Sequence, residues 1–200
     1  MELILASSSA RRFDLLTQAG FIFQVHDPEE VEALASRPTR PAALQARVLA
    51  LAKARSAAQR HNLHSPTLVL AADTLVALNN HIIGKARDRA HAREILAMLS
   101  GTTHQVITAL ALLELPLGPS LVEHDVTSVT MAELSTGQIQ QYLETNLWQG
   151  KAGAYAIQEN DAFILKIDGS FSNVVGLPLQ LFERMLRDFL PAQSVQELKR

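Results

Sequence analysis

The amino-acid sequence predicts an α/β protein in which helices flank a mixed sheet. Segments typical of strands and segments typical of helices alternate along its 200 residues, and this alternation is characteristic of layered α/β domains. Two long strand-like segments, His104–Leu113 and Leu121–Met131, are separated only by a loop that contains proline and glycine, which favours an antiparallel pair across the middle of the molecule. A hydrophobic content of 48% is enough for a full core.

The first third of the sequence begins with a strand and a helix. Glu2–Ala6 is a short apolar run, and Ser9 after it is a favourable N-cap residue for a helix. The acidic and proline residues that follow the helix are typical of an exposed loop. The elements expected here are a strand at Glu2–Ala6, a helix from Ser9 to about Gly20, a strand at Phe21–Val25, a loop at Asp27–Pro38 and a helix from about Pro41 to Gln59.

The rest of the sequence alternates in the same way. Thr67–Ala72 is an apolar strand that we expect to end at Asp73, and the Asn-Asn pair at 79–80 lies between two apolar runs, which predicts a hairpin turn. Asp88 is a favourable cap for the next helix. The elements expected after the hairpin are a helix over Arg89–Leu99 that ends at Gly101, the two long strands, a helix over Leu134–Asn146, an extended segment at Ala162–Ile167 and a final amphipathic helix over Leu177–Leu190.

Composition and missing motifs exclude several classes of protein. A formal net charge of -2 and a pI near 6.4 argue against duplex nucleic acid as a partner, because its binders usually carry a clustered basic face. The sequence has no cysteine, hence no disulfide and no thiolate metal site, which fits a reducing compartment. We find no signal peptide and no apolar run as long as a membrane span, so we expect a cytoplasmic protein without a membrane partner. Phosphate-loop, dinucleotide-turn, metalloprotease and serine-hydrolase motifs are also missing.

The segment ASSSARRFDLL, which opens the first helix, suggests a phosphate site. Ser7, Ser8 and Ser9 bring hydroxyls and unpaired backbone N–H groups to a helix N-terminus, a common arrangement for phosphate binding. Arg11 and Arg12 lie in the first turn, although the helix dipole disfavours cations there. A bound phosphate would resolve this conflict through charge-assisted hydrogen bonds. The alternative is a serine-capped helix with two solvated arginines.

Asp73 is a candidate for metal binding or for orienting a water molecule. It follows an apolar strand, and ligands of open α/β sheets gather at the carboxyl ends of strands. Glu29, Glu30 and Glu32 in the acidic loop could supply a second carboxylate, because Mg²⁺ is usually held by one or two carboxylates together with substrate phosphates. The alternatives are a turn residue for Asp73 and a solvated loop for the glutamates.

Two lysines and one segment rich in small residues complete the candidates. Lys53 lies in an apolar stretch of a helix and Lys85 follows Gly84, so either could reach a phosphate or could pack its stem on apolar neighbours. In the segment KAGAYAIQ, small residues surround Tyr155 and Gln158. This composition suits a base pocket in which tyrosine stacks and the amide reads a base edge, or else a tight helix on the sheet.

The segments taken together resemble the Maf family of nucleoside triphosphate pyrophosphatases. The resemblance covers nearly the whole chain, through LILASSSARR, AADTLV, GKARD, LSGTTHQVITALAL, KAGAYAIQ and GSFSNVVGLPL in this order. It implies a Maf/ITPase-like fold, with a central mixed, elongated and twisted sheet flanked by helices. It also implies a single domain over residues 1–200 with a cleft between two lobes, a homodimer, and hydrolysis of a nucleoside triphosphate to the monophosphate and diphosphate with a divalent cation, Mg²⁺, Mn²⁺ or Co²⁺.

Within this family the sequence is similar to the branch that acts on dTTP and UTP, and such activity would limit incorporation of surplus or modified nucleotides into nucleic acids. The alternatives are the 7-methyl-GTP branch and a nucleotide-binding regulator of cell division without catalysis. The resemblance implies the following roles: Asp73 as proton acceptor, Arg11, Thr74 and Gln158 in base specificity, Ser7, Arg12, Lys53 and Lys85 at the phosphates, and Glu32 with Asp73 at the metal.

The sequence departs from the family pattern at three positions. Ala10 replaces a proline, Ala52 replaces a glutamate before the helix lysine, and Ala86 replaces a proline after Gly-Lys. Alanine is a good helix former, so we expect the opening turn to survive the change at Ala10. The loss of the glutamate at Ala52 is expected to alter the rate or the metal preference.

Overall fold

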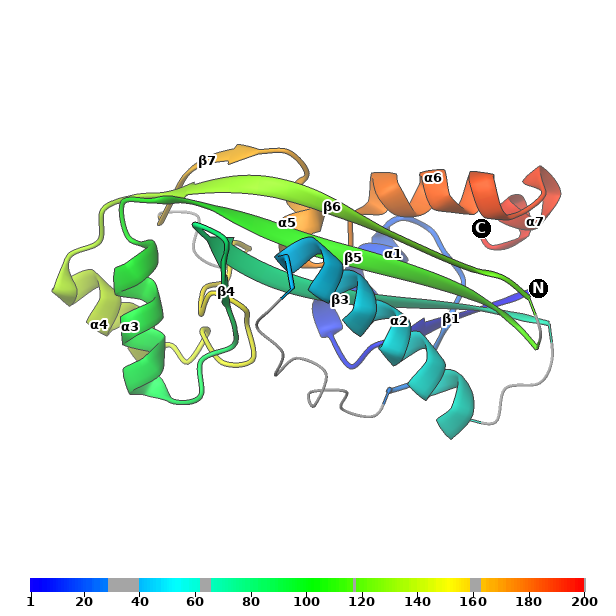
Figure 1. Cartoon of the computed structure of the whole chain (residues 1–200), viewed down its shortest axis with the longest axis horizontal. Helices are drawn as coiled ribbons and strands as arrows, with labels where there is room; N and C mark the ends of the chain where they lie inside the picture. Colours follow the sequence, from blue (N-terminus) through cyan, green and yellow to red (C-terminus); the bar gives the residue numbers. More distant parts are fainter. Residues whose placement is uncertain (29–39, 62–65, 117, 159–162, 200) are drawn as a thin grey trace.

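A mixed seven-stranded sheet runs along the whole molecule (Figure 1). The computed structural model describes residues 1–28, 40–61, 66–116, 118–158 and 163–199. The order of the strands is β2-β1-β3-β5-β6-β7, and β4 pairs with one end of β3. β1 is parallel to β2 and to β3, whereas β3, β5, β6 and β7 form antiparallel pairs. The predicted α/β class, with a mixed sheet flanked by helices, is confirmed.

The strands and helices follow the predicted order closely. The strands are β1 (Glu2–Ala6), β2 (Gln24–Val25), β3 (Thr67–Leu78), β4 (His81–Ile83), β5 (Thr103–Leu115), β6 (Ser120–Met131) and β7 (Ile164–Asp168). The helices are α1 (Ala10–Gln18), α2 (Ala42–Arg60), α3 (Arg89–Leu99), α4 (Thr136–Glu144), α5 (Phe171–Val175), α6 (Leu179–Phe189) and α7 (Ala192–Glu197). No helix among the described residues is long and apolar enough to cross a membrane.

The two faces of the sheet carry different cores. α2 lies across one face in Figure 1 and packs on it through alanines such as Ala50, Ala54 and Ala57, against small side chains of the strands. The larger core contains the fully buried Leu16 and Phe182 and receives side chains from α1, α3, α4, α5 and α6. Because alanines let α2 approach the sheet closely, a long side chain of α2 can reach the middle of β3.

One edge of β3 is unpaired over a short stretch that contains the candidate residues Asp73 and Thr74. β1 leaves β3 at the pair Ala6 and Ala71, and β4 joins β3 at Val76. Between these points, at residues 72–75, no described strand pairs with this edge, while β5 continues the ladder on the other side. The expectation that a strand ends at Asp73 is therefore wrong, because the pairing with β5 carries β3 unbroken to Leu78. The strand that ends beside Asp73 is β1.

Several local predictions can be compared with the structure directly. Asn79 and Asn80 have φ values of 49° and 64° and form the predicted hairpin turn. The Asp88 side chain accepts from the His91 N–H at 2.8 Å and caps α3 as expected. Phe21–Val25 is only partly a strand, since β2 contains two residues and Phe21 forms an isolated bridge with Lys199.

The C-terminal region differs from the prediction in two ways. The amphipathic helix predicted at Leu177–Leu190 is α6, but it is not the final helix, because Pro191 opens the short helix α7 after it. The helix α5 between β7 and α6 was not predicted, because five residues are too few for a helical period to show in the sequence. The predicted loop at Asp27–Pro38 lies outside the described residues beyond position 28.

Candidate active site

Arg12 connects three segments that lie far apart in the sequence. Arg12 lies in the first turn of α1, and its guanidinium reaches Thr74 on the unpaired stretch of β3. Nε donates to the Gly176 carbonyl oxygen at 2.8 Å, Nη1 donates to Ser7 Oγ at 3.2 Å, and Nη2 donates to Thr74 Oγ1 at 3.2 Å. A guanidinium has five N–H groups, so these three bonds fix its orientation, and two N–H groups have no partner among the residues that the structure describes.

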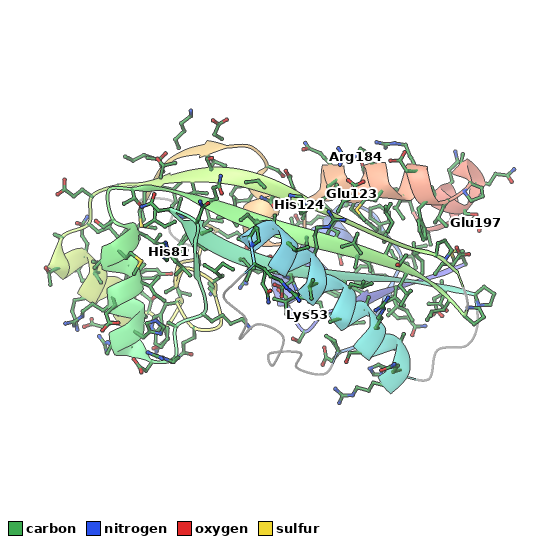
Figure 2. All side chains as sticks on the ribbon, in the orientation of Figure 1. Lys53, His81, Glu123, His124, Arg184 and Glu197 are labelled. Atoms are coloured by element: carbon green, nitrogen blue, oxygen red, sulfur yellow. The ribbon has the colours of Figure 1, made fainter. Side chains whose placement is uncertain are left out.

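Asp73 and Lys53 form a close ion pair beside Arg12. Lys53 projects from α2, and its Nζ atom lies 2.5 Å from Asp73 Oδ1, with both side chains largely buried. Figure 2 labels Lys53 on α2, the helix that lies across one face of the sheet in Figure 1. The pair places the carboxylate at the end of β1, with its orientation set by the ammonium group.

Positive charge exceeds negative charge around this carboxylate. Burial lowers the pKa of Arg12 to about 10, Asp73 opposes the shift, and Arg11 adds to it. Burial also lowers the pKa of Lys53, again opposed by Asp73 and strengthened by Arg12 and Lys85. Within the described part of the chain, four cationic side chains thus act on one another around one buried carboxylate, and a bound anion would relieve their repulsion. The arrangement suits a ligand with several phosphate groups.

Ser7 completes the phosphate side of the site. It is buried at the end of β1, and its Oγ atom accepts from the Ser9 backbone N–H at 3.2 Å as well as from Arg12. Ser9 takes the N-cap position of α1 as predicted, but its side chain makes no cap hydrogen bond. The start of α1 therefore presents the buried Ser7 hydroxyl next to Arg12.

Thr74 links the site to α5 through a chain of hydrogen bonds. Its Oγ1 atom lies 2.9 Å from Thr108 Oγ1 on β5, and Thr108 in turn contacts Asn173 of α5. Asn173 is fully buried and donates through Nδ2 to the Val106 carbonyl at 3.0 Å and to Thr127 Oγ1 at 2.8 Å. This network holds α5, and hence the Gly176 carbonyl that follows it, against the sheet.

The segment that carries Gln158 is attached to the segment that carries Lys85. Lys85 forms a bridge with Ala152, and the Gly153 N–H donates to the Gly84 carbonyl at 3.3 Å. Lys85 and Gln158 are both exposed. The segment Lys151–Gln158 forms turns rather than the tight helix considered as an alternative.

Tyr155 is part of the core and does not offer its ring for stacking on a base. It is 7% exposed, and its hydroxyl lies 2.8 Å from Nε2 of the buried His104. Burial raises the pKa of Tyr155 and lowers that of His104 to about 4. The interpretation of Tyr155 as a stacking residue is therefore wrong, because the sequence pattern did not show which side of the turn faces His104.

The carboxylates allow only part of a metal site to be described. Asp73 is a buried carboxylate with one oxygen bonded to Lys53, and such a group fits Mg²⁺, which takes one or two carboxylates and completes its shell with phosphates and water. No group of three or more histidine and carboxylate side chains suited to a metal occurs among the described residues. Glu29, Glu30 and Glu32 lie outside the described ranges.

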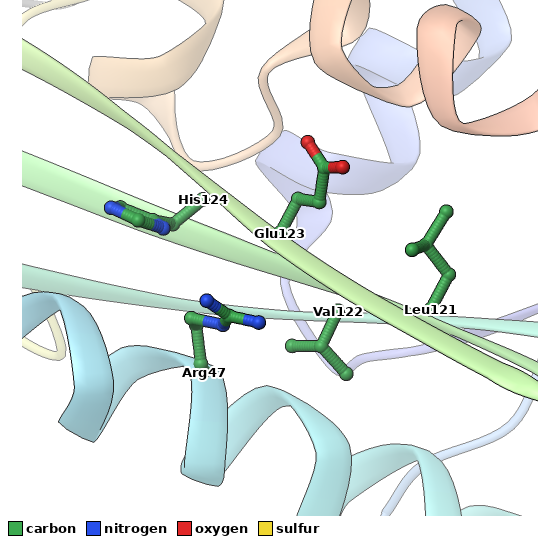
Figure 3. Close-up of a pocket in the computed structure, with 5 residues that line it drawn as sticks. All are labelled: Arg47, Leu121, Val122, Glu123 and His124. Carbon is green, nitrogen blue, oxygen red and sulfur yellow. The ribbon is translucent and has the colours of Figure 1, made fainter. Parts of the chain in front are cut away.

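A separate depression lies between α2 and β6 (Figure 3). Figure 3 shows Arg47 of α2 facing Val122 and His124 of β6, with Leu121 and Glu123 along the same strand. It is open to solvent and includes none of the candidate residues described above. We therefore place the site at the end of β1 and not in this depression.

Three residues of the site were missed in the sequence. Thr108, Asn173 and Gly176 come from β5, from α5 and from the turn after α5, and each contacts Arg12, Thr74 or their direct partners. One signal was present, because an asparagine within the apolar segment Phe171–Val175 requires hydrogen-bond partners if it is buried. Nothing in the sequence indicated which partners these are.

Comparisons with known proteins identify a family and several similar proteins. Residues 2–189 match the family described as Maf-like protein. A protein of Symbiobacterium thermophilum named dTTP/UTP pyrophosphatase is 46% identical over 189 residues, which cover 94% of each chain. Proteins with the same name from Moorella thermoacetica and Brucella abortus are 42% and 44% identical, with 94% of this chain covered and 95% and 91% of theirs.

Proposed function

The chain belongs to the Maf-like family, and on this premise we propose that it is a nucleoside triphosphate pyrophosphatase acting on dTTP and UTP. The products are dTMP or UMP and diphosphate. The proposed substrates are those named for the relatives, which match the chain over nearly their whole length. Such a reaction would limit incorporation of surplus or modified pyrimidine nucleotides into nucleic acids.

One observation carries the proposal, namely the cluster of cations around Asp73. Arg12 and Lys53 lie close to Asp73, the one buried carboxylate among the described residues; burial lowers the pKa of both, and repulsion from Arg11, Arg12 and Lys85 adds to the shifts. A triphosphate supplies the negative charge that this cluster lacks, and it offers acceptors for the two unused N–H groups of Arg12. A neutral ligand would leave the repulsion in place.

The proposed reaction is attack of water on the α-phosphorus. Asp73 takes a proton from the water, the new oxygen–phosphorus bond forms, and the bond to the oxygen that bridges to the β-phosphorus breaks. Arg12, Lys53 and Lys85 stabilise the negative charge that develops on the phosphates, and Ser7 donates to a phosphate oxygen. Diphosphate leaves with the electron pair of the broken bond.

A divalent cation belongs to this proposal. Asp73 would hold it together with Glu32, and Mg²⁺, Mn²⁺ or Co²⁺ would supply neutralisation of phosphate charge when bound. Lys53 bonds to only one oxygen of the Asp73 carboxylate, which leaves the other oxygen for the metal or the water. Ala52, in place of the family glutamate, removes a carboxylate from the same turn of α2.

Base specificity is assigned to Arg11, Thr74 and Gln158. Arg11 neighbours Arg12 in α1, Thr74 is bonded to Arg12, and Gln158 lies at the exposed end of the segment bridged to Lys85. We further propose that the chain has two lobes with the site in the cleft between them, and that it forms a homodimer. Light scattering on the purified protein tests the dimer.

The test of the function is a screen for diphosphate release. The purified protein is incubated with dTTP, UTP, CTP and 7-methyl-GTP in the presence of Mg²⁺, Mn²⁺ or Co²⁺. We expect monophosphate and diphosphate from dTTP and UTP. Preferred hydrolysis of 7-methyl-GTP would place the protein in the other branch of the family, and nucleotide binding without diphosphate release under any of the metals would indicate a regulator.

A further inference from the structure

Thr108 is a buried residue of β5 with no role in the mechanism proposed above. Its side chain has no exposed surface. Its hydroxyl donates to the Asn173 carbonyl oxygen at 2.9 Å, and its oxygen also lies 2.9 Å from Thr74 Oγ1. Thr108 therefore stands between the helix α5 and a residue of the candidate active site.

The bond to Asn173 fixes the direction of the bond to Thr74. A hydroxyl has one proton, and a carbonyl oxygen only accepts, so the proton of Thr108 belongs to the bond with Asn173. At the contact between the two threonines Thr108 must then accept and Thr74 must donate. Thr74 Oγ1 also accepts from Arg12 Nη2 at 3.2 Å. The Thr74 proton is used in the bond to Thr108, so Thr74 can offer a ligand only its remaining lone pair.

Ser7, on the other side of Arg12, has the opposite property. Its Oγ atom accepts from Arg12 Nη1 and from the Ser9 N–H, and within the described residues its own proton has no acceptor. Ser7 can donate to a phosphate oxygen, whereas Thr74 cannot. Because phosphate oxygens need donors, Thr74 is suited to a different part of the substrate, one that presents an N–H or O–H group.

We propose that Thr108 is a positioning residue that makes Thr74 an acceptor for the imide N3–H of uracil or thymine. The inference rests on the proposed function and gives a chemical reason for a preference for dTTP and UTP. Cytosine has an unprotonated N3, so it would place a second lone pair against Thr74 and leave both groups without a hydrogen bond. The 3′ hydroxyl of the sugar is the other donor that UTP and dTTP share, and the experiment separates it from the base.

The first part of the experiment uses the unmodified protein. Values of kcat/KM are measured for UTP, CTP, N3-methyl-UTP and 3′-deoxy-UTP. We expect CTP and N3-methyl-UTP to fall at least about 10-fold below UTP, because a hydrogen bond is lost, and 3′-deoxy-UTP to stay close to UTP. The inference would be overturned if N3-methyl-UTP were hydrolysed as efficiently as UTP, or if only 3′-deoxy-UTP showed a loss of kcat/KM. No diphosphate from either UTP or dTTP would instead refute the proposed function.

The second part compares Thr108→Val with Thr108→Ser. Valine keeps the shape but removes the acceptor, so the Thr74 proton becomes free to donate to N3 of cytosine. The ratio of kcat/KM for UTP over CTP should fall about 10-fold in T108V, mainly through KM, and T108S should restore it. An equal loss on both nucleotides with a constant ratio would show a purely structural role and overturn the inference. If T108V does not fold, the analogue series still tests whether the site reads N3–H, and Thr108→Ala takes the place of T108V in the test of Thr108.

Discussion

Lys53 Nζ lies 2.5 Å from Asp73 Oδ1 at the place where β1 has ended and the edge of β3 is uncovered. The lysine comes from the alanine-rich face of α2 and the aspartate from the middle of a strand. The pair therefore depends on close packing of α2 against the sheet. It fixes one oxygen of the carboxylate, and the other oxygen has no hydrogen-bond partner among the described residues.

Replacement of Asp73 by asparagine should stop turnover and preserve the fold. The side-chain amide oxygen introduced by D73N can still accept from Lys53, but an amide cannot take a proton from water. We expect kcat to fall by about 10²–10⁴-fold, the usual contribution of a general base, while nucleotide binding measured by calorimetry is retained. Asp168→Asn, at an exposed carboxylate, is the control. Full activity in D73N would remove Asp73 from this role.

Replacement of Arg12 by lysine should be severe although it keeps the charge. One ammonium group cannot bond to Gly176, Ser7 and Thr74 and also present two N–H groups to phosphate. We expect kcat/KM for UTP to fall by about 100-fold, measured by diphosphate release. The matched control is Arg184→Lys, an exposed arginine paired with Glu123, which should change little. An equal loss of kcat/KM in R12K and R184K would contradict a role for the three hydrogen bonds of the Arg12 guanidinium.

Replacement of Gly176 by alanine should destabilise the protein and disturb the site. Gly176 has a φ of +117°, and an added Cβ would lie 3.2 Å from Thr74 Oγ1 and 3.5 Å from Arg12 Nε. Such a backbone conformation costs a residue with a side chain about 1–3 kcal/mol, so the free energy of unfolding should fall by about that amount. Gly137→Ala, in α4 and without close neighbours, should be neutral or stabilising in the same denaturation experiment. A G176A protein as stable as G137A would argue against this strain.

The buried His104 should make stability depend on pH. Burial lowers its pKa from 6.5 to about 4, so between these values the unfolded chain binds a proton that the folded protein does not. The neutral, buried His104 therefore contributes about 3 kcal/mol to the free energy of unfolding above about pH 6.5. This contribution is lost as the pH falls to about 4. Urea titrations measure the free energy of unfolding at pH 7 and pH 4. Between these pH values we expect it to fall by about 3 kcal/mol less in His104→Gln than in the unchanged protein.

The exposed His81 provides the comparison for this measurement. His81→Gln should keep the pH dependence of the unchanged protein, because its side chain is exposed in β4. If the two glutamine variants respond to pH alike, the dependence comes from other groups.

Prediction from the sequence succeeded where the signals were local. The N-cap at Ser9, the cap at Asp88 and the turn at Asn79 and Asn80 are set by neighbouring residues, and each was placed correctly. The identity of the family and the likeness to the dTTP/UTP branch also came from short motifs. In these cases the information lies within a few residues of the feature.

Prediction from the sequence failed where the structure of a segment depends on contacts with residues far away in the sequence. β3 continues through Asp73 because β5 pairs with it, and a polar residue in an apolar run gave no sign of that ladder. Tyr155 packs in the hydrophobic core, and its hydroxyl contacts His104, which lies 51 residues earlier in the sequence. The role of Asn173 is of the same kind, since its partners come from β5 and β6. Hydrogen-bond partners of buried polar groups are a property of tertiary structure.

The bond between Arg12 and the Gly176 carbonyl spans 164 residues, and this has a consequence for synthesis of the protein on the ribosome. Arg12 is made among the first residues, but its principal acceptor is made near the end. A nascent chain that still lacks α5 cannot orient the guanidinium, however well α1 and β1 have formed. The ability to hold a nucleotide should therefore arise late and abruptly during translation, and a chain released early should have none.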